Sequence, residues 1–142
     1  MGEILSICIS EKKGTLKNEI SEANFIEDFG IENDAHAGKW HRQVSLLGFE
    51  KIDAFRKKGA NVDFGAFGEN LVVEGIELEK LPIGQKIKIG DVLLEVTQIG
   101  KKCHDKCQIY YQVGECIMPK NGIFTKVLSG GKVKIGDKCE LV

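Results

Sequence analysis

Short runs in which apolar and polar residues alternate recur along the chain. Lysine alternates with isoleucine in Lys86–Ile89 before Gly90-Asp91, and the pattern repeats at Lys132–Ile135 before Gly136-Asp137. Alternation with a period of two is typical of a strand buried on one face, and Gly-Asp favours a tight turn. Each copy therefore predicts a hairpin, with partner strands at 92–97 and 138–142. Similar runs predict strands at 2–10, 43–47, 69–73 and 123–128.

Helical patterns are scarce. Residues Phe49–Lys58 place their aromatic and isoleucine side chains on one face, pair Asp53 with Lys57 at four residues' spacing, and end before Gly59, a suitable C-terminal cap. Weaker patterns predict short helices at Glu22–Phe29 and His104–Tyr111. Because no linker or low-complexity stretch interrupts the chain, we expect residues 1–142 to form a single domain. Its predicted fold is mostly β, a β-barrel with a few short helices.

Composition narrows the classes of function. The 142 residues carry a net charge of −1, which gives no overall bias toward nucleic acid or anionic lipid. No apolar run approaches the ~20 residues of a membrane span, and the first residues lack the features of a signal peptide. We therefore expect a cytoplasmic protein that binds neither nucleic acid nor membrane. The sequence leaves its oligomeric state open.

The chain has an odd number of cysteines, five, which favours free thiols in a reducing compartment. Two of them, Cys8 and Cys139, lie in strand-like runs and are expected to fill the core as small apolar residues. The other three are Cys103, Cys107 and Cys116.

The strongest candidate for chemistry is Cys103. Lys101, Lys102 and Lys106 surround it, directly after a predicted strand. Nearby positive charge favours the thiolate, the form that attacks, ligates metal or carries sulfur. Cys107 follows after three intervening residues rather than the two typical of zinc or thioredoxin-like pairs. A zinc or redox pair is thus an alternative to a single reactive thiol at Cys103.

A second candidate segment, Asp34–Gln43, holds two of the three histidines, the only tryptophan and an arginine. Its His36, His41 and Arg42 are suited to binding an anion. The same histidines with Asp34 could instead ligate zinc or iron. A third reading is a polar loop packed by the tryptophan.

A third segment, Phe64–Leu71, is a glycine-rich loop that leads into a strand. Its backbone N–H groups could approach an oxyanion closely, as in phosphate-binding nests. No helix follows, so it is neither a P-loop nor a dinucleotide-binding motif.

Together these segments resemble the MOSC domain, named after the C-terminal part of molybdenum cofactor sulfurases. The resemblance rests on five motifs in order: D-A-H-A-G with H-R-Q-V (34–44), G-A-F-G-E-N-L (65–71), L-P-I-G-Q with I-G-D-V-L-L-E-V-T (81–97), Cys103, and the closing strands from Gly122 and Gly131. It implies a β-barrel like the barrel domain of pyruvate kinase.

The resemblance also implies a function with the molybdenum cofactor, a pterin that carries a dithiolene and a phosphate. In the family the cysteine, here Cys103, is thought to carry sulfur as a persulfide or to ligate molybdenum. Carried over, the cofactor-binding residues would be His36, His41, Arg42, Asn70 and Lys102, and the metal ligand Cys103. No pyridoxal phosphate site is expected, so persulfide would need a donor.

Two classes of function follow from the resemblance. The first is a sulfur carrier or sulfurtransferase, or a small molybdenum-dependent reductase, acting through Cys103. The second is a non-catalytic module that binds the cofactor and delivers it to a partner. The expected partners are a desulfurase that donates sulfur, a molybdoenzyme, or both. A zinc-stabilised structural domain is a third, more distant alternative.

Overall fold

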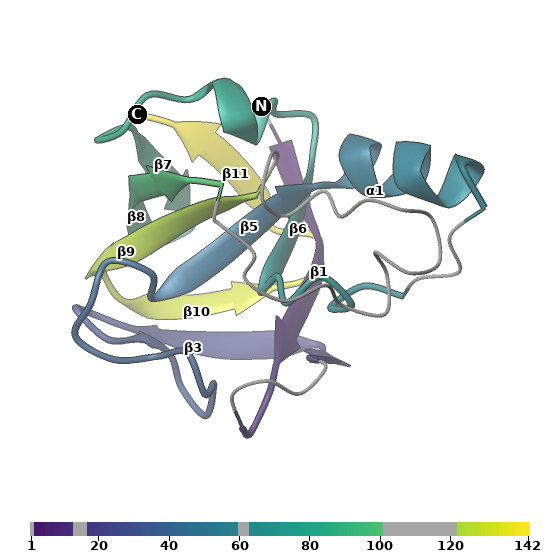
Figure 1. The fold of residues 1–142 in the computed structure, drawn as a ribbon. Coiled ribbons are helices and arrows are strands. Elements are labelled where there is room, and N and C mark those ends of the chain that lie inside the picture. Colours follow the sequence, from purple (N-terminus) through teal and green to yellow (C-terminus); the bar gives the residue numbers. More distant parts are fainter. Residues whose placement is uncertain (1, 13–16, 60–62, 101–121) are drawn as a thin grey trace.

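The computed structural model describes residues 2–12, 17–59, 63–100 and 122–142. Within them the chain forms a closed β-barrel with a small second sheet beneath it and one α-helix on its outer wall (Figure 1). The barrel strands are β1 (Gly2–Ile9), β5 (Val44–Gly48), β6 (Leu71–Glu74), β7 (Lys86–Ile89), β8 (Val92–Ile99), β9 (Ile123–Ser129) and β11 (Lys138–Leu141).

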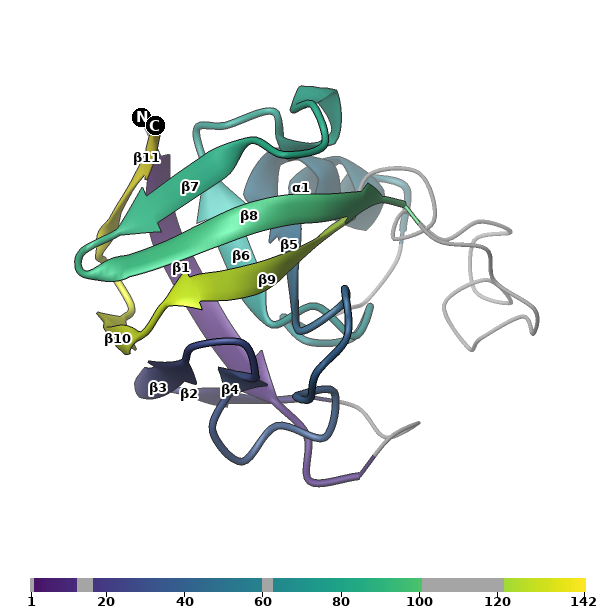
Figure 2. The same ribbon diagram turned by 90° about the vertical axis from the view of Figure 1, so that its left-hand side faces the viewer.

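The barrel closes in the order β11-β7-β8-β9-β5-β6-β1, and β1 then pairs with β11. Figure 2 shows these two strands side by side, with both labelled chain ends together. All neighbouring strands are antiparallel except β5 and β6, which pair in parallel. In the sequence, α1 (Phe49–Lys57) lies between these two strands. A short strand, β2 (Asn18–Ile20), extends the sheet beyond β1. The predicted β-barrel is confirmed.

Strand β5 is buried along its whole length because both of its faces are covered. Leu46 points into the barrel, whereas Leu47 joins the cluster under α1 with Ile52 and Phe55. The predicted helix is confirmed: Asp53 and Lys57 form an ion pair of 3.2 Å, and Gly59 follows the C-cap with a φ of +102°.

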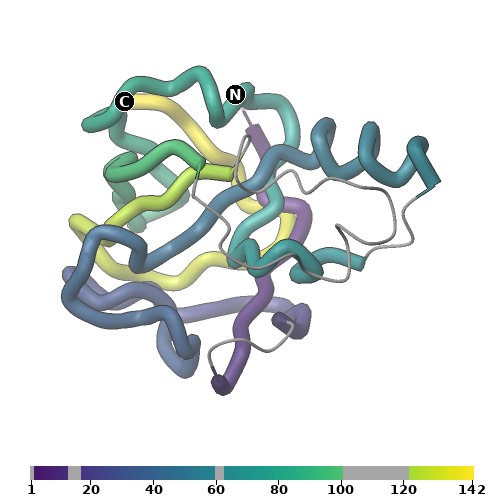
Figure 3. The backbone as a smooth tube through the Cα atoms, in the orientation of Figure 1, coloured from purple at the N-terminus to yellow at the C-terminus, as the bar shows by residue number. Residues whose placement is uncertain are grey.

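One end of the barrel is covered by the connection between β6 and β7, which includes the 3₁₀ helix η1 (Leu78–Lys80). Figure 3 shows this connection passing over the end where both chain ends lie. Its apolar side chains, Ile76, Leu78 and Leu81, are buried in the barrel core. The site described below therefore has to lie elsewhere on the barrel.

The second sheet corrects two of our predictions. Residues Glu22–Phe29 do not form a helix: Glu22–Ile26 is strand β3, whose alternate residues Ala23 and Phe25 are buried, and Asp28 and Gly30 then take positive φ values. Strand β3 lies between β10 (Gly131–Lys134) and β4 (Gly30–Ile31). The true spacing of the buried side chains is two, as a strand requires.

The two Lys-x-Lys-x-Gly-Asp copies also differ. The first forms the predicted hairpin of β7 and β8. In the second, β10 pairs with β3 while β11 pairs with β1 and β7, so that predicted hairpin is wrong. Asp137 ends β10 by accepting a 2.8 Å hydrogen bond from the Lys134 N–H. The second Gly-Asp turn therefore leads the chain from the second sheet, which contains β10, into the barrel, which β11 closes.

Candidate functional site

A charged pair is buried below the segment that carries the histidines. Lys17, just before β2, places Nζ 2.7 Å from Asp34 Oδ1, and the two side chains are 1% and 0% exposed. Lys17 Nζ also lies 3.3 Å from Ser10 Oγ and 3.0 Å from His36 Nδ1. A buried ion pair is stable only when its remaining hydrogen-bonding groups are satisfied, and here they are. The pair fixes His36 against the end of β1.

Asn70 connects this pair to the barrel wall. Its Nδ2 donates to Asp34 Oδ2 (3.2 Å) and to the Cys8 carbonyl (3.0 Å), while its Oδ1 accepts from the Ser45 N–H (3.0 Å). The residue is 1% exposed. Asn70 therefore joins β1, β5 and β6 around Asp34, and its amide is already used within the protein. Its predicted contact with a cofactor stays a prediction.

The glycine-rich loop does gather its N–H groups around an anion, but that anion belongs to the chain. The carboxylate of Glu69 accepts hydrogen bonds from the N–H groups of Gly65 (2.8 Å) and Phe67 (3.1 Å). Burial raises the pKa of Glu69, against the opposing effect of these hydrogen bonds and of Lys17. The nest predicted for an external phosphate is thus filled by Glu69.

Arg42 is the described cation best placed for an outside ligand. Its guanidinium carbon lies 4.7 Å from the centroid of the Trp40 ring and 5.5 Å from that of Phe124. Trp40 in turn donates a 2.8 Å hydrogen bond from Nε1 to the His36 carbonyl. The Nε of Arg42 is buried and meets no hydrogen-bond partner among the residues that the structure describes. Such a donor favours an acceptor supplied by a ligand.

His41 contacts the end of β8, which precedes the segment that contains Cys103 in the sequence. Its Nε2 is 2.8 Å from Gln98 Oε1, and its carbonyl accepts a hydrogen bond from Thr97 Oγ1. Two residues after Gln98, the Gly100 N–H donates to the Gly122 carbonyl (2.6 Å). These two glycines bound residues 101–121, so Cys103, Lys102, Cys107, Cys116 and the predicted helix 104–111 lie outside the described residues.

The structure therefore links three of the predicted site residues, His36, Arg42 and Asn70. His36, Trp40 and Arg42 are in contact as a chain, and the Lys17–Asp34 pair joins His36 to Asn70. His41 is exposed: its ring meets the Trp40 ring edge-on at a centroid distance of 6.1 Å, and its Nε2 lies 2.8 Å from Gln98 Oε1 on β8. Whether Cys103 joins this group stays a prediction.

A metal site at Asp34 and His36 is not supported. Within the described part of the chain no three histidine, cysteine or acidic side chains are grouped as metal ligands. Lys17 Nζ lies between Asp34 Oδ1 and His36 Nδ1, so an ammonium group takes the place that a cation would need. The alternative of zinc or iron at this segment is thereby disfavoured.

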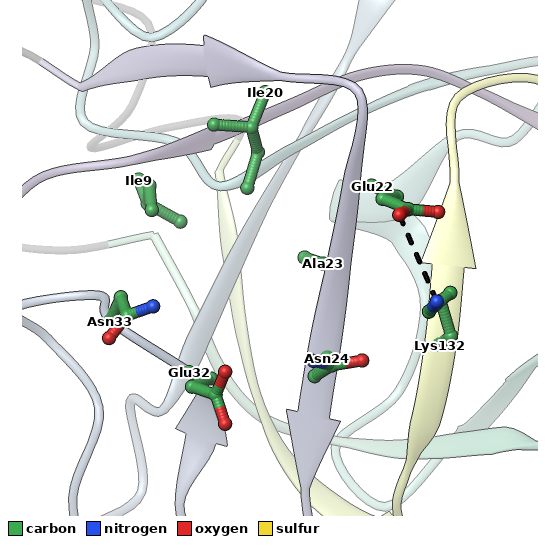
Figure 4. Close-up of a pocket in the computed structure, with 8 residues that line it drawn as sticks. All are labelled: Ile9, Ile20, Glu22, Ala23, Asn24, Glu32, Asn33 and Lys132. Carbon is green, nitrogen blue, oxygen red and sulfur yellow. Dashed lines mark ion pairs between the residues drawn. The ribbon is translucent and has the colours of Figure 1, made fainter.

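A hollow of about 330 Å³ lies between β1 and the second sheet (Figure 4). Glu22 and Lys132 form an ion pair of 3.8 Å at its edge, and Ile9, Ile20, Glu32 and Asn33 also line it. No predicted site residue lines it. This hollow is therefore separate from the candidate site.

Sequence reasoning missed Lys17 and Ser10. Lys17 is one of twenty Lys and Arg residues and lies in no recognisable pattern. The one available signal was indirect: a buried Asp34 requires a counter-ion.

The remaining cysteines of the described structure are core residues. Cys8 and Cys139 are free and fully buried in β1 and β11, as predicted. Burial raises the pKa of Cys8 to about 11 and that of Cys139 to about 12. Neither thiol is suited to nucleophilic chemistry near neutral pH.

No helix in the described residues is long and apolar enough to cross a membrane.

Comparisons with known proteins agree with this fold. The structure of the YuaD protein from Bacillus subtilis matches with a TM-score of 0.81 and 19% identity, covering 99% of this chain and 96% of that one. YiiM from Geobacillus stearothermophilus matches with a TM-score of 0.73 and 19% identity, covering 100% of this chain and 75% of that one. YiiM from Escherichia coli matches with a TM-score of 0.67 and 21% identity, covering 99% and 69%.

These identities are low, so the likeness to solved structures shows the fold alone. No curated protein matches the chain significantly in sequence. A family model does match: the MOSC domain model covers residues 33–140, which include the Asp34–Gln43 segment, the glycine-rich loop and Cys103. The chain belongs to the MOSC domain family, a family linked to binding of the molybdenum cofactor.

Proposed function

We propose that this protein binds the pterin–molybdenum cofactor and carries or transfers sulfur through Cys103, as a persulfide or as a thiolate that ligates molybdenum. The observation that carries the proposal is the family match over residues 33–140, which contains every motif of the candidate site. The described geometry adds a cationic and hydrogen-bonding surface formed by His36, Trp40 and Arg42.

The described residues fit an anionic ligand at one position above all. Arg42 Nε is buried and without a partner in the described part of the chain, so an oxygen or sulfur acceptor there would complete its hydrogen bonding. The glycine-rich loop does not fit a phosphate, because Glu69 already occupies its N–H groups. We therefore assign anion binding to Arg42, with His36, His41 and Lys102 as further contacts.

When bound, the cofactor would supply molybdenum and the dithiolene sulfur atoms. The chain's own contribution is the thiol of Cys103, whose lysine neighbours favour the thiolate. In sulfur transfer this thiolate attacks the outer sulfur of a donor's persulfide. One S–S bond forms on Cys103, the donor's S–S bond breaks, and the donor leaves as a thiolate. The exchange needs no external oxidant or reductant.

The test is purification of the full chain from a molybdenum-replete host, followed by metal analysis, pterin analysis and intact mass. We expect molybdenum and a pterin to copurify, and Cys103 to carry the added mass of one sulfur atom after incubation with a persulfide donor. Absence of the pterin from a host that makes it would contradict cofactor binding.

Two variants separate the roles of the residues. Arg42→Gln should weaken cofactor affinity roughly tenfold to a hundredfold, the effect of losing a charge-assisted hydrogen bond of about 1.5–3 kcal/mol. Arg56→Gln, whose guanidinium lies over the Phe64 ring and away from the contacts of Arg42 with Trp40 and Phe124, is the matched control and should bind as the wild type does.

Cys103→Ser should abolish sulfur loading. If it leaves both cofactor binding and the activation of a partner molybdoenzyme intact, the chain is a delivery module rather than a sulfur carrier.

A further inference from the structure

A buried chain of hydrogen bonds starts at a backbone amide and ends at His36, and the direction of each bond is determined. The Ser45 N–H can only donate, so the Asn70 atom 3.0 Å away is its amide oxygen. The Cys8 carbonyl can only accept, so the Asn70 atom 3.0 Å from it is its amide nitrogen. These two backbone groups fix the orientation of the Asn70 side chain independently of each other.

Asp34 receives donors at both of its oxygens. Asn70 Nδ2 donates to Oδ2 (3.2 Å), and the Ser10 N–H donates to Oδ1 (3.1 Å). Neither donor can accept a proton in return. This is the environment of an ionised carboxylate, which accepts at both oxygens and has no proton to donate. Its side chain is fully buried, so it requires a cationic partner inside the protein.

That partner is Lys17, and its three contacts match the three protons of an ammonium group. Nζ lies 2.7 Å from Asp34 Oδ1, 3.3 Å from Ser10 Oγ and 3.0 Å from His36 Nδ1. An ammonium group has donors but no lone pair, so it must donate to the imidazole nitrogen. The Nδ1 of His36 is therefore unprotonated, and the ring proton lies on Nε2.

Metal-binding histidines have the opposite arrangement. There the second ring nitrogen donates its N–H to a carboxylate, carbonyl or water, which leaves a lone pair on the ligating nitrogen. In this protein the second nitrogen of His36 faces a donor instead. The other nitrogen is thus left with a proton to donate.

We propose that Lys17 is a positioning residue, which holds His36 neutral with its proton on Nε2. The Nε2 N–H of His36 then donates to a hydrogen-bond acceptor, such as a phosphate or carbonyl oxygen or a sulfur anion, and does not ligate a metal cation. The tautomer rests on the contacts above alone. The assignment of the acceptor to a cofactor rests on the proposed function.

The direct test reads the tautomer in the wild-type protein and uses one substitution only to assign the signals. The full chain is prepared with ¹⁵N-labelled histidine rings, without cofactor, and long-range ¹H–¹⁵N spectra are recorded at pH 7. His36→Gln identifies the His36 signals among those of the three histidines. We expect one unprotonated nitrogen, Nδ1, and one protonated nitrogen, Nε2. A ring protonated at Nδ1, or at both nitrogens, would overturn the proposal.

Lys17→Met tests whether the lysine is responsible, because it keeps the length of the side chain but removes all three donors. We expect loss of the single-tautomer pattern at His36, whereas Lys17→Arg should retain it. Lys138→Met, which removes an exposed lysine, is the matched control and should change nothing at His36. A folded Lys17→Met protein with an unchanged His36 pattern would refute the role of Lys17.

Lys17→Met leaves a buried carboxylate without its partner, which destabilises the fold. Lys17→Met combined with Asp34→Asn removes both charges and is the second variant. The same loss of the His36 pattern is expected from it, and retention would refute the role. All of these spectra are recorded without cofactor. A failed tautomer prediction therefore leaves the cofactor proposal standing, and a failed cofactor test leaves the tautomer standing.

Discussion

The glycine-rich loop offers a sharp test of packing, because two of its glycines differ in their surroundings. Both have positive φ, +92° at Gly65 and +81° at Gly68. A Cβ added at Gly65 would lie 2.5 Å from the Lys17 carbonyl oxygen and 3.3 Å from Cys8 Sγ. A Cβ added at Gly68 would meet nothing within 4 Å. Gly65→Ala thus adds a steric clash that Gly68→Ala lacks.

The magnitudes follow from these two environments. A left-handed backbone costs a residue with a Cβ about 1–2 kcal/mol, and a less flexible unfolded chain returns about 0.4–1 kcal/mol. Overpacking adds about 1–3 kcal/mol. We therefore expect Gly68→Ala to lower the free energy of unfolding by about 0–1.5 kcal/mol and Gly65→Ala by about 1–4.5 kcal/mol. Backbone atoms cannot move aside as a flexible side chain can, which favours the upper part of the second range.

Urea unfolding of both variants, followed by tryptophan fluorescence and circular dichroism, measures the difference. The m-values should stay equal to that of the wild type, so that the midpoints report stability alone. Equal losses in the two variants would show that the close approach of the loop to Lys17 is wrong.

Three further results are expected. Lys17→Met should lower the free energy of unfolding by about 3–5 kcal/mol, because it leaves the Asp34 carboxylate buried and unpaired. Lys138→Met, at an exposed lysine, should lower it by only about 0–1 kcal/mol. Similar losses for the two variants in urea unfolding would contradict the buried pair. Because burial raises their pKa values to about 11 and about 12, Cys8 and Cys139 should react with iodoacetamide at pH 7 only as fast as the chain unfolds; fast labelling of the native protein would contradict this. The raised pKa of Glu69 means that the folded state binds the Glu69 proton more tightly than the unfolded state does. The contribution of Glu69 to stability is therefore largest below the usual pKa of 4.5 and falls as pH rises through the folded pKa. Glu69→Gln should remove this slope from the pH profile of unfolding, and an unchanged slope would refute the prediction.

Strands such as β7 and β8 could be predicted from sequence because they bury one face and therefore alternate, whereas β5 is buried on both faces. The helix was predictable too, since its buried residues Ile52 and Phe55 follow helical spacing. The second sheet was not. Strand β3 (Glu22–Ile26) pairs with β10 and β4, which are distant or very short in the sequence, and no local signal tells which of two similar Gly-Asp turns will form a hairpin.

The candidate site, too, could be predicted from the sequence only in part. Motifs within one segment, such as the one containing His36 and Arg42, were visible as unusual groupings of residue types. The residues that support these motifs could not be predicted, because Lys17, Asp34 and Asn70 are far apart in the sequence and meet only in the folded structure. The same holds for the glycine-rich loop, whose partner anion proved to be Glu69, two residues beyond Phe67.

The pairing of β1 with β11 affects how the protein folds. Gly2 pairs with Cys139 and Glu3 with Lys138, so the contact that closes the barrel joins residues nearly a whole chain apart. Such contacts form late and slow folding, because the entropy of the intervening chain must be lost first. During synthesis, β1 and β7 must wait with unpaired edges until β11 emerges from the ribosome. Nascent chains stalled before Lys138 are therefore expected to be the species most prone to aggregate, and the most dependent on chaperones.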